Sequence, residues 1–154
     1  MLATPTLFKE VFLFKSINHK DKRGSFSELY HRSDFIRANG GRVDFCQDNL
    51  THSKKGVLRG LHYQLPPFSQ SKLVSVIEGS VLDVVVDIRR GSPTFGQYFS
   101  QELNNENRFQ MFIPRGFAHG FITTSKNAEV HYKTNNFWDK DSERTIIWND
   151  QDLN

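Results

Sequence analysis

Short runs of strand-forming residues recur along the chain, and a cluster of turn-forming residues closes each run. Turn signals such as DKRG, HSKKG, LPPF and RRGSPT stand between the runs. Regular short strands joined by tight turns predict an all-β sandwich or barrel. We expect one helix, at residues 33–41, with a cap at Ser33 or Asp34 and an end at Gly40. The strand-like runs span residues 8–15, 24–31, 42–50, 57–64, 72–79, 80–89, 95–103, 108–114, 116–124, 128–135 and 144–150.

The size and charge of the chain limit its class. Its 154 residues suffice for one domain, fourteen phenylalanines supply much of the core, and no repeat or linker divides the sequence. We therefore predict a single domain of residues 1–154. Twenty basic and seventeen acidic residues give a net charge of +3, which is too small and too scattered to indicate nucleic acid. This bias suits a small anionic ligand such as a phosphorylated metabolite.

The cellular location follows from weaker signals. The single Cys46 fits a reducing compartment, and the N-terminus lacks the basic region that precedes the apolar stretch of a signal peptide. No apolar run approaches the roughly 18 residues of a membrane-spanning helix. We therefore predict a soluble cytoplasmic protein without a membrane partner.

Alternation within the strands predicts which polar side chains face inward. Tyr132 alternates with charged neighbours and is expected inside, and His119 shares a face with two phenylalanines. Strict alternation separates Arg59 from His62. A bulge at Gly60 would bring both to one side, since glycine tolerates such a kink.

Several ionisable groups therefore converge, namely Arg59, His62, Lys72, His119 and Tyr132. Each alone could be a satisfied structural residue, but an unpaired buried polar group costs about 1–3 kcal/mol, so a stable core would avoid all five. An open-mouthed barrel that holds one small ligand is the alternative. A histidine base, a tyrosine acid and a lysine that stabilises an enolate favour proton transfer next to a carbonyl.

Metal catalysis is the rival reading. The segment PRGFAHGF (114–121) looks like the second motif of the cupin superfamily. Metal-binding cupins need two histidines one residue apart in their first motif, and that place reads His62-Tyr63-Gln64 here. The second ligand is missing, and no set of three or four ligands stands out. We expect neither a metal nor another cofactor.

Taken together, these motifs resemble one family. The chain is similar to the dTDP-4-dehydrorhamnose 3,5-epimerases, cupin-like jelly-roll homodimers that act on a nucleotide-linked 4-keto sugar. The matching segments follow the family's order from about Asp21 to Leu153. They are DKRGSFSELYH, FCQDNLTHSKKGVLRGLHYQ, QSKLVSVIEGSVLDVVVDIRRGSPTFG, FIPRGFAHGF, VHYKTNNFW and IIWNDQDL.

The resemblance implies an architecture and an activity. It implies a cupin-type jelly-roll barrel with a short peripheral helix, in a homodimer that exchanges N-terminal strands, with residues such as Phe26 reaching the partner's pocket. The implied substrate is a dTDP-linked 4-keto-6-deoxy sugar of rhamnose-type biosynthesis. The implied reaction inverts carbons 3 and 5, whose protons are acidic because carbon 4 is a ketone.

The resemblance also implies three catalytic roles. His62 matches the general base that removes the two protons, and Lys72 matches the lysine that stabilises the enolate oxygen. Tyr132 matches the tyrosine that returns a proton from the opposite face. A base and an acid on opposite faces are what inversion of a stereocentre requires.

The remaining matches concern binding. Arg23 and Arg59 match arginines that hold the diphosphate or sugar, and Trp138 falls where the family stacks an aromatic ring on thymine. Without the resemblance, Arg23 could equally be a surface turn residue, and Phe26 and Trp138 ordinary core. Other pocket positions match Phe26, Glu28, Gln47, Asn49 and His119.

The sequence departs from the family at two places. The family pairs its catalytic histidine with an aspartate beyond the WND motif, and this sequence ends shortly after that motif. Another carboxylate could substitute, with Asp83 as the candidate unless it serves His119; otherwise the enzyme works without one, or its activity is altered. The second departure is Ser25, where the family often has an aromatic residue, and it could alter which sugar fits.

Two alternatives remain beside the 3,5-epimerase. One is an epimerase that inverts carbon 3 alone, and the other is a non-catalytic nucleotide-sugar binding domain, suggested by the absent aspartate. The related 3,4-ketoisomerases keep the barrel but lack RGLHYQ followed by this lysine, so we favour them less.

Overall fold

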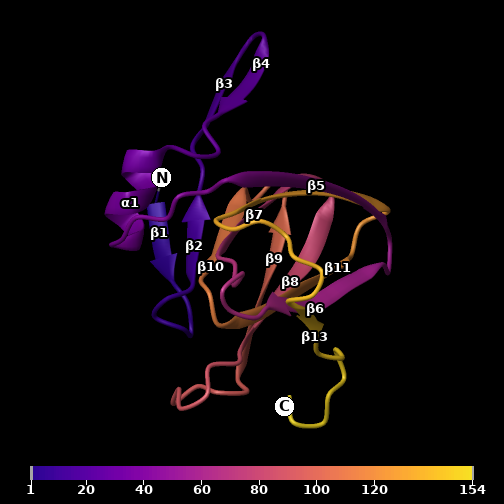
Figure 1. Ribbon diagram of the computed structural model, residues 1–154. Helices are drawn as coiled ribbons and strands as arrows, with labels where there is room; N and C mark the ends of the chain where they lie inside the picture. Colours follow the sequence, from indigo (N-terminus) through magenta and orange to yellow (C-terminus); the bar gives the residue numbers. More distant parts are fainter. Residues whose placement is uncertain (1, 154) are drawn as a thin grey trace.

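The computed structural model describes residues 2–153, which form thirteen strands and one helix. Two antiparallel sheets face each other, and a two-stranded hairpin stands apart from them (Figure 1). The first sheet contains, in spatial order, β1 (Leu2–Pro5), β2 (Phe12–Lys15), β10 (Phe109–Ile113), β7 (Lys72–Glu78), β12 (Asn127–Thr134) and β5 (Gln47–Lys54). The second contains β13 (Glu143–Thr145), β6 (Leu58–Gln64), β11 (Phe117–Thr123), β8 (Ser80–Asp87) and β9 (Tyr98–Asn104).

The main hydrophobic core fills the space between the two sheets. Strands of both sheets contribute to it: in β11, Phe117 and Phe121 are buried in this core, and Val130 of β12 meets them from the other sheet. The predicted all-β jelly-roll architecture is therefore confirmed.

A second, aromatic cluster holds the helix α1 (Arg32–Asn39) against the outside of the six-stranded sheet. Phe35 is fully buried there, with its ring 5.3 Å from that of Phe14 and 5.2 Å from that of Phe112. The predicted end at Gly40 is confirmed, because this residue takes the left-handed conformation at φ 72°.

The predicted cap at Ser33 or Asp34 is wrong. The residue before the first turn is His31, whose side chain makes no capping hydrogen bond. Ser33 and Asp34 lie inside the first turn, where the Asp34 carboxylate lies 3.3 Å from the Arg37 guanidinium.

The sequence patterns missed two strands and misplaced the limits of several others: the run 8–15 is a strand only as β2, the run 24–31 only as β4 (Gly24–Ser27), and the run 42–50 is displaced to β5. β1 ends in a proline, Pro5, and β3 (Asn18–Asp21) has the polar sequence NHKD without an apolar face. The expected strand at 144–150 is limited to β13, since residues 146–150 form irregular structure and turns.

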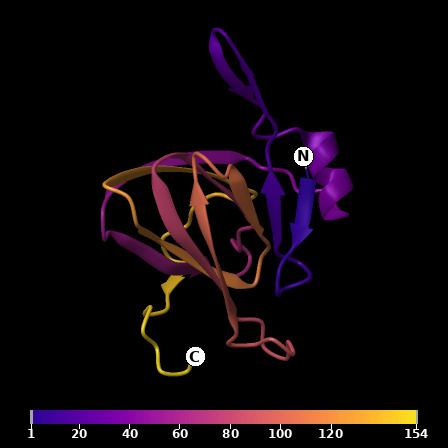
Figure 2. The same cartoon turned by 180° about the vertical axis from the view of Figure 1, so that it is seen from behind.

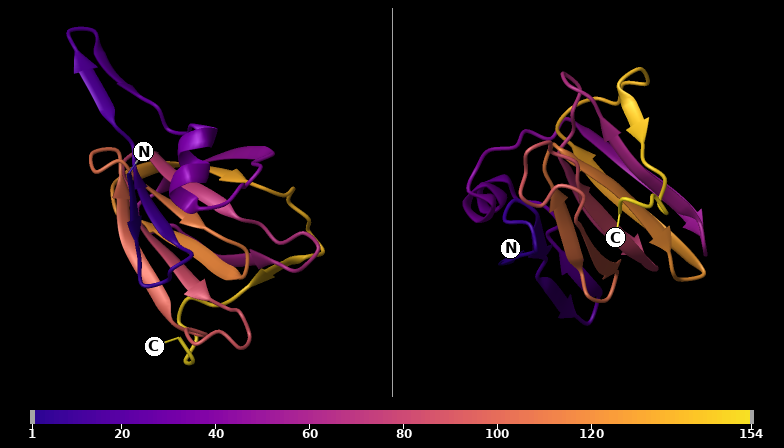
Figure 3. Two further views of the ribbon diagram at one scale, coloured as in Figure 1. Left: turned by 90° about the vertical axis from the view of Figure 1, so that its left-hand side faces the viewer. Right: turned by 90° about the horizontal axis from the view of Figure 1, so that it is seen from below.

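The hairpin of β3 and β4 (Gly24–Ser27), which we call the arm, projects away from both sheets (Figures 1 and 2). Its base is tied to the body, because Arg108 donates to the Ser27 hydroxyl at 3.1 Å. The last described residues, 147–153, lie at the opposite end of the molecule (Figure 3). Among residues 2–153, no helix is long and apolar enough to cross a membrane.

A buried ion-pair network secures the loop between β8 and β9. Asp87 is inaccessible to solvent and receives three hydrogen bonds from Arg89, two from the guanidinium at 2.8 and 2.9 Å and one from the backbone N–H at 2.9 Å. Ser92 and Thr94 each donate one more, at 2.6 Å. Burial opposes ionisation, but these bonds outweigh it and hold the pKa of Asp87 well below its ordinary value. Arg89 also pairs with Glu10 at 2.9 Å, which joins the N-terminal segment to this loop.

Candidate active site

The site begins at a bulge in β6. His119 of β11 lies opposite His62, but Phe121, two residues on, lies opposite Arg59, three residues back. The extra residue lets Arg59 and His62 line one cavity, as the sequence pattern at Gly60 predicts. Gly60 has φ +130° and lies so close to β11 that a Cβ there would lie 2.5 Å from the Gly120 Cα atom.

A cavity of about 230 Å³ lies between the two sheets, because strands of both contribute to its lining. A neighbouring cavity of about 680 Å³ shares His62, Lys72 and His119 with it. The two cavities therefore meet at these three cationic or imidazole side chains. The smaller cavity is lined by Thr51, Arg59, His62, Lys72, His119, Phe121, Tyr132, Trp138 and Glu143.

The sheets divide the central residues between them. His62 belongs to β6 and His119 to β11 of the five-stranded sheet, whereas Lys72 begins β7 and Tyr132 lies on β12 of the six-stranded sheet. A flat molecule in the cavity would therefore have His62 on one side and Tyr132 on the other.

Of the two roles that the sequence left open for Asp83, the structure shows the pairing with His119 and not the orientation of His62. The two Asp83 carboxylate oxygens lie 2.9 and 3.0 Å from Nε2 of His119, and the pair is buried. The reason is the strand order: β11 lies between β8 and β6, so the Asp83 carboxylate meets the histidine of the adjacent strand first.

The surroundings of His62 favour its neutral form. Partial burial lowers the pKa of His62, and the positive charges of Lys72 and Arg59, with the His119 ring, lower it further. The Glu143 carboxylate acts in the opposite direction. At neutral pH the imidazole is thus free to accept a proton.

Burial acts on the two groups of the facing sheet as well. It lowers the pKa of Lys72, although the carboxylates of Asp83 and Glu143 favour the ammonium. It raises the pKa of Tyr132, despite the opposite effect of Arg59, so the phenol keeps its proton. The cavity thus favours a neutral imidazole at His62 and a protonated phenol at Tyr132.

Arg59 and Trp138 line the cavity, and the polar side chains that contact them are suited to a nucleotide. The Arg59 Nε atom donates to the Ser53 hydroxyl at 2.9 Å. Gln47 donates to the Asn49 side chain at 2.8 Å and accepts from the Trp138 backbone N–H at 3.4 Å. The Trp138 side chain remains 55% exposed beside these groups, which makes it available for stacking.

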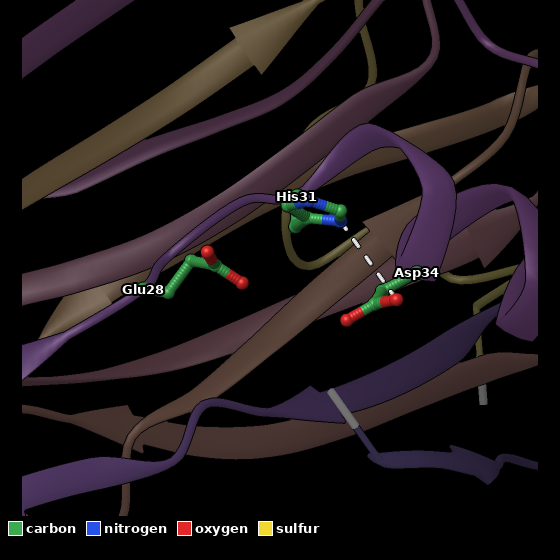
Figure 4. Close-up of side chains that lie close together, drawn as sticks. All are labelled: Glu28, His31 and Asp34. Carbon is green, nitrogen blue, oxygen red and sulfur yellow. Dashed lines mark ion pairs between the residues drawn. The ribbon is translucent and has the colours of Figure 1, made fainter.

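Three predicted binding residues lie elsewhere in the chain. Arg23 and Phe26 are on the arm, where Arg23 binds the Asp21 carboxylate at 2.6 Å and Phe26 is 68% exposed. Glu28 lies just beyond the arm, beside His31 and Asp34 (Figure 4). None of the three lines the cavity that contains His62.

Sequence reasoning missed Thr51 and Glu143. Thr51 shares the inward face of β5 with Gln47 and Asn49, so alternation could have found it. Glu143 lies in the polar run DKDSER, which reads as a turn, and only the pairing of β13 with β6 brings it to the cavity.

The fold and the site define an enzyme of the cupin-like jelly-roll class. A sequence profile of the dTDP-4-dehydrorhamnose 3,5-epimerases matches residues 5–154, and the chain belongs to this family. The resemblance seen in the sequence is thereby confirmed.

Individual relatives agree with this assignment. A dTDP-4-dehydrorhamnose 3,5-epimerase of Shigella flexneri is 50% identical over 154 residues, which are 100% of this chain and 85% of the relative. The crystal structure of a dTDP-6-deoxy-D-glucose-3,5-epimerase from Legionella pneumophila, in complex with dTDP-4-keto-L-rhamnose, superposes with a TM-score of 0.96 at 43% identity, covering 99% and 80% of the two chains. The structure of the Bacillus anthracis dTDP-4-dehydrorhamnose 3,5-epimerase with TDP and pyrophosphate bound gives 0.94 at 37% identity, covering 99% and 87%.

Proposed function

We propose that this protein inverts carbons 3 and 5 of a dTDP-linked 4-keto-6-deoxy-hexose in rhamnose-type deoxysugar biosynthesis. The observation that carries the proposal is the arrangement of His62 and Tyr132 on facing sheets around one cavity, with Lys72 beside them. Membership of the 3,5-epimerase family supports the same reaction.

The chemistry follows from the protonation of these groups. Neutral His62 removes the proton next to the ketone, because its lowered pKa leaves the imidazole free to act as a base. The electrons move to the ketone oxygen, and the Lys72 ammonium stabilises the enolate. Tyr132 returns a proton to the same carbon from the opposite side, since its raised pKa keeps the phenol protonated. The configuration of that carbon is then inverted.

The nucleotide end of the substrate has its own partners. Arg59 keeps its terminal nitrogens for the diphosphate, because its Nε atom is already bound to Ser53. Trp138 offers a flat, exposed ring to the base, and its backbone N–H donates to Gln47, which in turn donates to Asn49.

Solvent exchange tests the reaction directly. We would incubate the protein with dTDP-4-keto-6-deoxyglucose in deuterated water and locate the label by NMR. Label at carbons 3 and 5 supports the proposal, and label at carbon 3 alone supports the narrower epimerase. Absence of exchange despite tight dTDP binding would leave a non-catalytic binding domain. His62→Asn should abolish the exchange, whereas His52→Asn, at an exposed histidine of β5, should leave it unchanged.

We further propose a homodimer in which the arm completes the site of a second copy. A two-stranded hairpin is at best marginally stable alone, and this one holds an exposed phenylalanine and an arginine away from its own body. Contact with a second copy would bury Phe26 and bring Arg23 to the partner's substrate, as the resemblance implies. The single-domain organisation and the cytoplasmic location stay predictions.

Complementation tests the arm. Arg23→Ala and His62→Ala should each be inactive, but subunits refolded together in equal amounts should recover about one quarter of the wild-type activity, since half of the dimers then contain one intact site. A mixture no more active than its components would contradict the exchange and leave the epimerase proposal standing.

A further inference from the structure

Gln64 lies two residues after His62 and is only 7% exposed. Its side chain makes three hydrogen bonds, all to backbone atoms of loops. The Nε2 atom donates to the carbonyl oxygens of Phe68, at 2.6 Å, and Phe137, at 3.1 Å, and Oε1 accepts from the Asp139 N–H at 2.8 Å. Both amide hydrogens and one lone pair of the oxygen are thus used to hold the backbone of two loops.

Two of these bonds are made on either side of Trp138. Phe137 precedes this tryptophan and Asp139 follows it, so the Gln64 amide holds the backbone before and after the ring. The third bond joins the same amide to the loop of residues 65–71. Trp138 itself lies in irregular structure and has no strand to fix it. Besides a longer bond of 3.4 Å from its own N–H to the Gln47 side chain, its backbone is held by the two Gln64 bonds on either side, so its orientation depends on Gln64.

This position has a chemical requirement. Two donors and one acceptor must meet three backbone atoms, which the primary amide of glutamine can do. A glutamate would lose both donors, and a methionine of similar length would lose the acceptor as well. Gln64 stands where metal-binding cupins carry the second histidine of their first motif, and in this chain the position organises a loop instead.

We propose that Gln64 is a positioning residue that sets the affinity for the flat base of the nucleotide by fixing Trp138. The inference rests on the proposed function, which assigns Trp138 to the base. Stacking is sensitive to the angle and offset of the ring, so a tryptophan released from its loop contacts would stack less well. The diphosphate, held by arginine, would be unaffected.

The test compares two ligands that differ in the base. We would measure the dissociation constants of dTDP and of pyrophosphate by calorimetry for the wild type and for Gln64→Met. We expect dTDP to bind about tenfold more weakly, within the range for lost base–aromatic stacking, and pyrophosphate to bind as before. Equal weakening of both ligands, or unchanged dTDP binding, would overturn the inference.

A matched control separates positioning from stability. Gln110 is another buried glutamine, 2% exposed, and donates to the Ser16 hydroxyl at 3.2 Å, far from the Trp138 loop in the chain. Gln110→Met likewise removes a buried amide and its hydrogen bond, and it should not change the ratio of the two affinities. A similar loss of dTDP affinity in this control would overturn the inference.

A double-mutant cycle identifies the route of the effect. In a Trp138→Ala background, Gln64→Met should cause almost no further loss of dTDP affinity, because the ring that it positions is gone. Additive losses would contradict the inference. If Gln64→Met does not fold, Gln64→Asn, which keeps the amide but shortens its reach, replaces it in the same cycle. Turnover of the wild type is measured separately and tests the epimerase proposal. The present inference is tested only by the ratio of the dTDP and pyrophosphate affinities.

Discussion

Replacing Gly60 by alanine should damage both the fold and the site. A Cβ atom at this position would lie 2.5 Å from the Gly120 Cα atom and 2.8 Å from the His119 carbonyl oxygen. Both contacts are with backbone, so no side chain can rotate away. Relief requires β6 and β11 to separate at the bulge that places Arg59 and His62 in the cavity.

The expected cost has two parts. A non-glycine residue at φ +130° is strained by about 1–3 kcal/mol, and overpacking adds about 1–3 kcal/mol. We therefore expect a loss of roughly 4 kcal/mol in the free energy of unfolding, a large part of the 5–15 kcal/mol typical of a folded domain. With a urea m-value of about 2 kcal/mol/M, the unfolding midpoint should fall by about 2 M.

Gly56→Ala is the matched control. Gly56 also has a positive φ, +79°, but nothing lies within 4 Å of the added Cβ atom, so only strain of about 1 kcal/mol remains. The assay is urea unfolding followed by circular dichroism at a fixed chain concentration. If the two variants unfold at the same midpoint, the close contact between β6 and β11 does not constrain the site and the reasoning is wrong.

Three further outcomes follow from the same structure. Tyr132→Phe should retain deuterium exchange at the substrate but lose about 10²–10⁴-fold in product formation, and equal losses in both would argue against its role as the acid. The acid limb of the kcat/KM pH profile should lie below the ordinary histidine pKa of about 6.5, and Glu143→Gln should move it lower still, because the carboxylate favours protonated His62; an upward shift would contradict this. Arg89→Met should destabilise by about 3 kcal/mol at pH 7. That difference should narrow as the pH falls below about 3.9, since the lowered pKa of Asp87 makes the pair stabilising above this pH, and a pH-independent difference would refute the assignment.

Alternation predicts most of the fold because the core lies between two sheets. A strand with one buried face must alternate, and this holds for β5, β9 and the first half of β12. β11 is buried along almost its whole length, because it lies inside the five-stranded sheet. Alternation fails for β3, whose residues are partly or fully exposed, since the arm has no core to cover. The sequence pattern contains no signal for such a strand.

The site was predictable where it depends on the face of a strand and unpredictable where it depends on neighbouring strands. His119 and Tyr132 point inward by local pattern, and the glycine at position 60 indicated the bulge that places Arg59 and His62 in one cavity. The partner of Asp83 depends on β11 lying between β8 and β6, which alternation does not determine. Glu143 reaches the cavity because the three-residue strand β13 pairs with β6. A strand of three residues is too short to show a periodic pattern in the sequence.

Because the site residues lie on two sheets, the hydrophobic core between the sheets sets the distance between them. If His62 and Tyr132 act on opposite sides of one sugar, the gap between them is set by the side chains that keep the sheets apart, such as Leu103 and Met111. Protein interiors are closely packed, so a change in core volume alters that gap. Core substitutions far from the substrate should therefore change the balance between proton removal and proton return. The thickness of the hydrophobic layer between the sheets therefore affects the rate of the reaction as well as the stability of the fold.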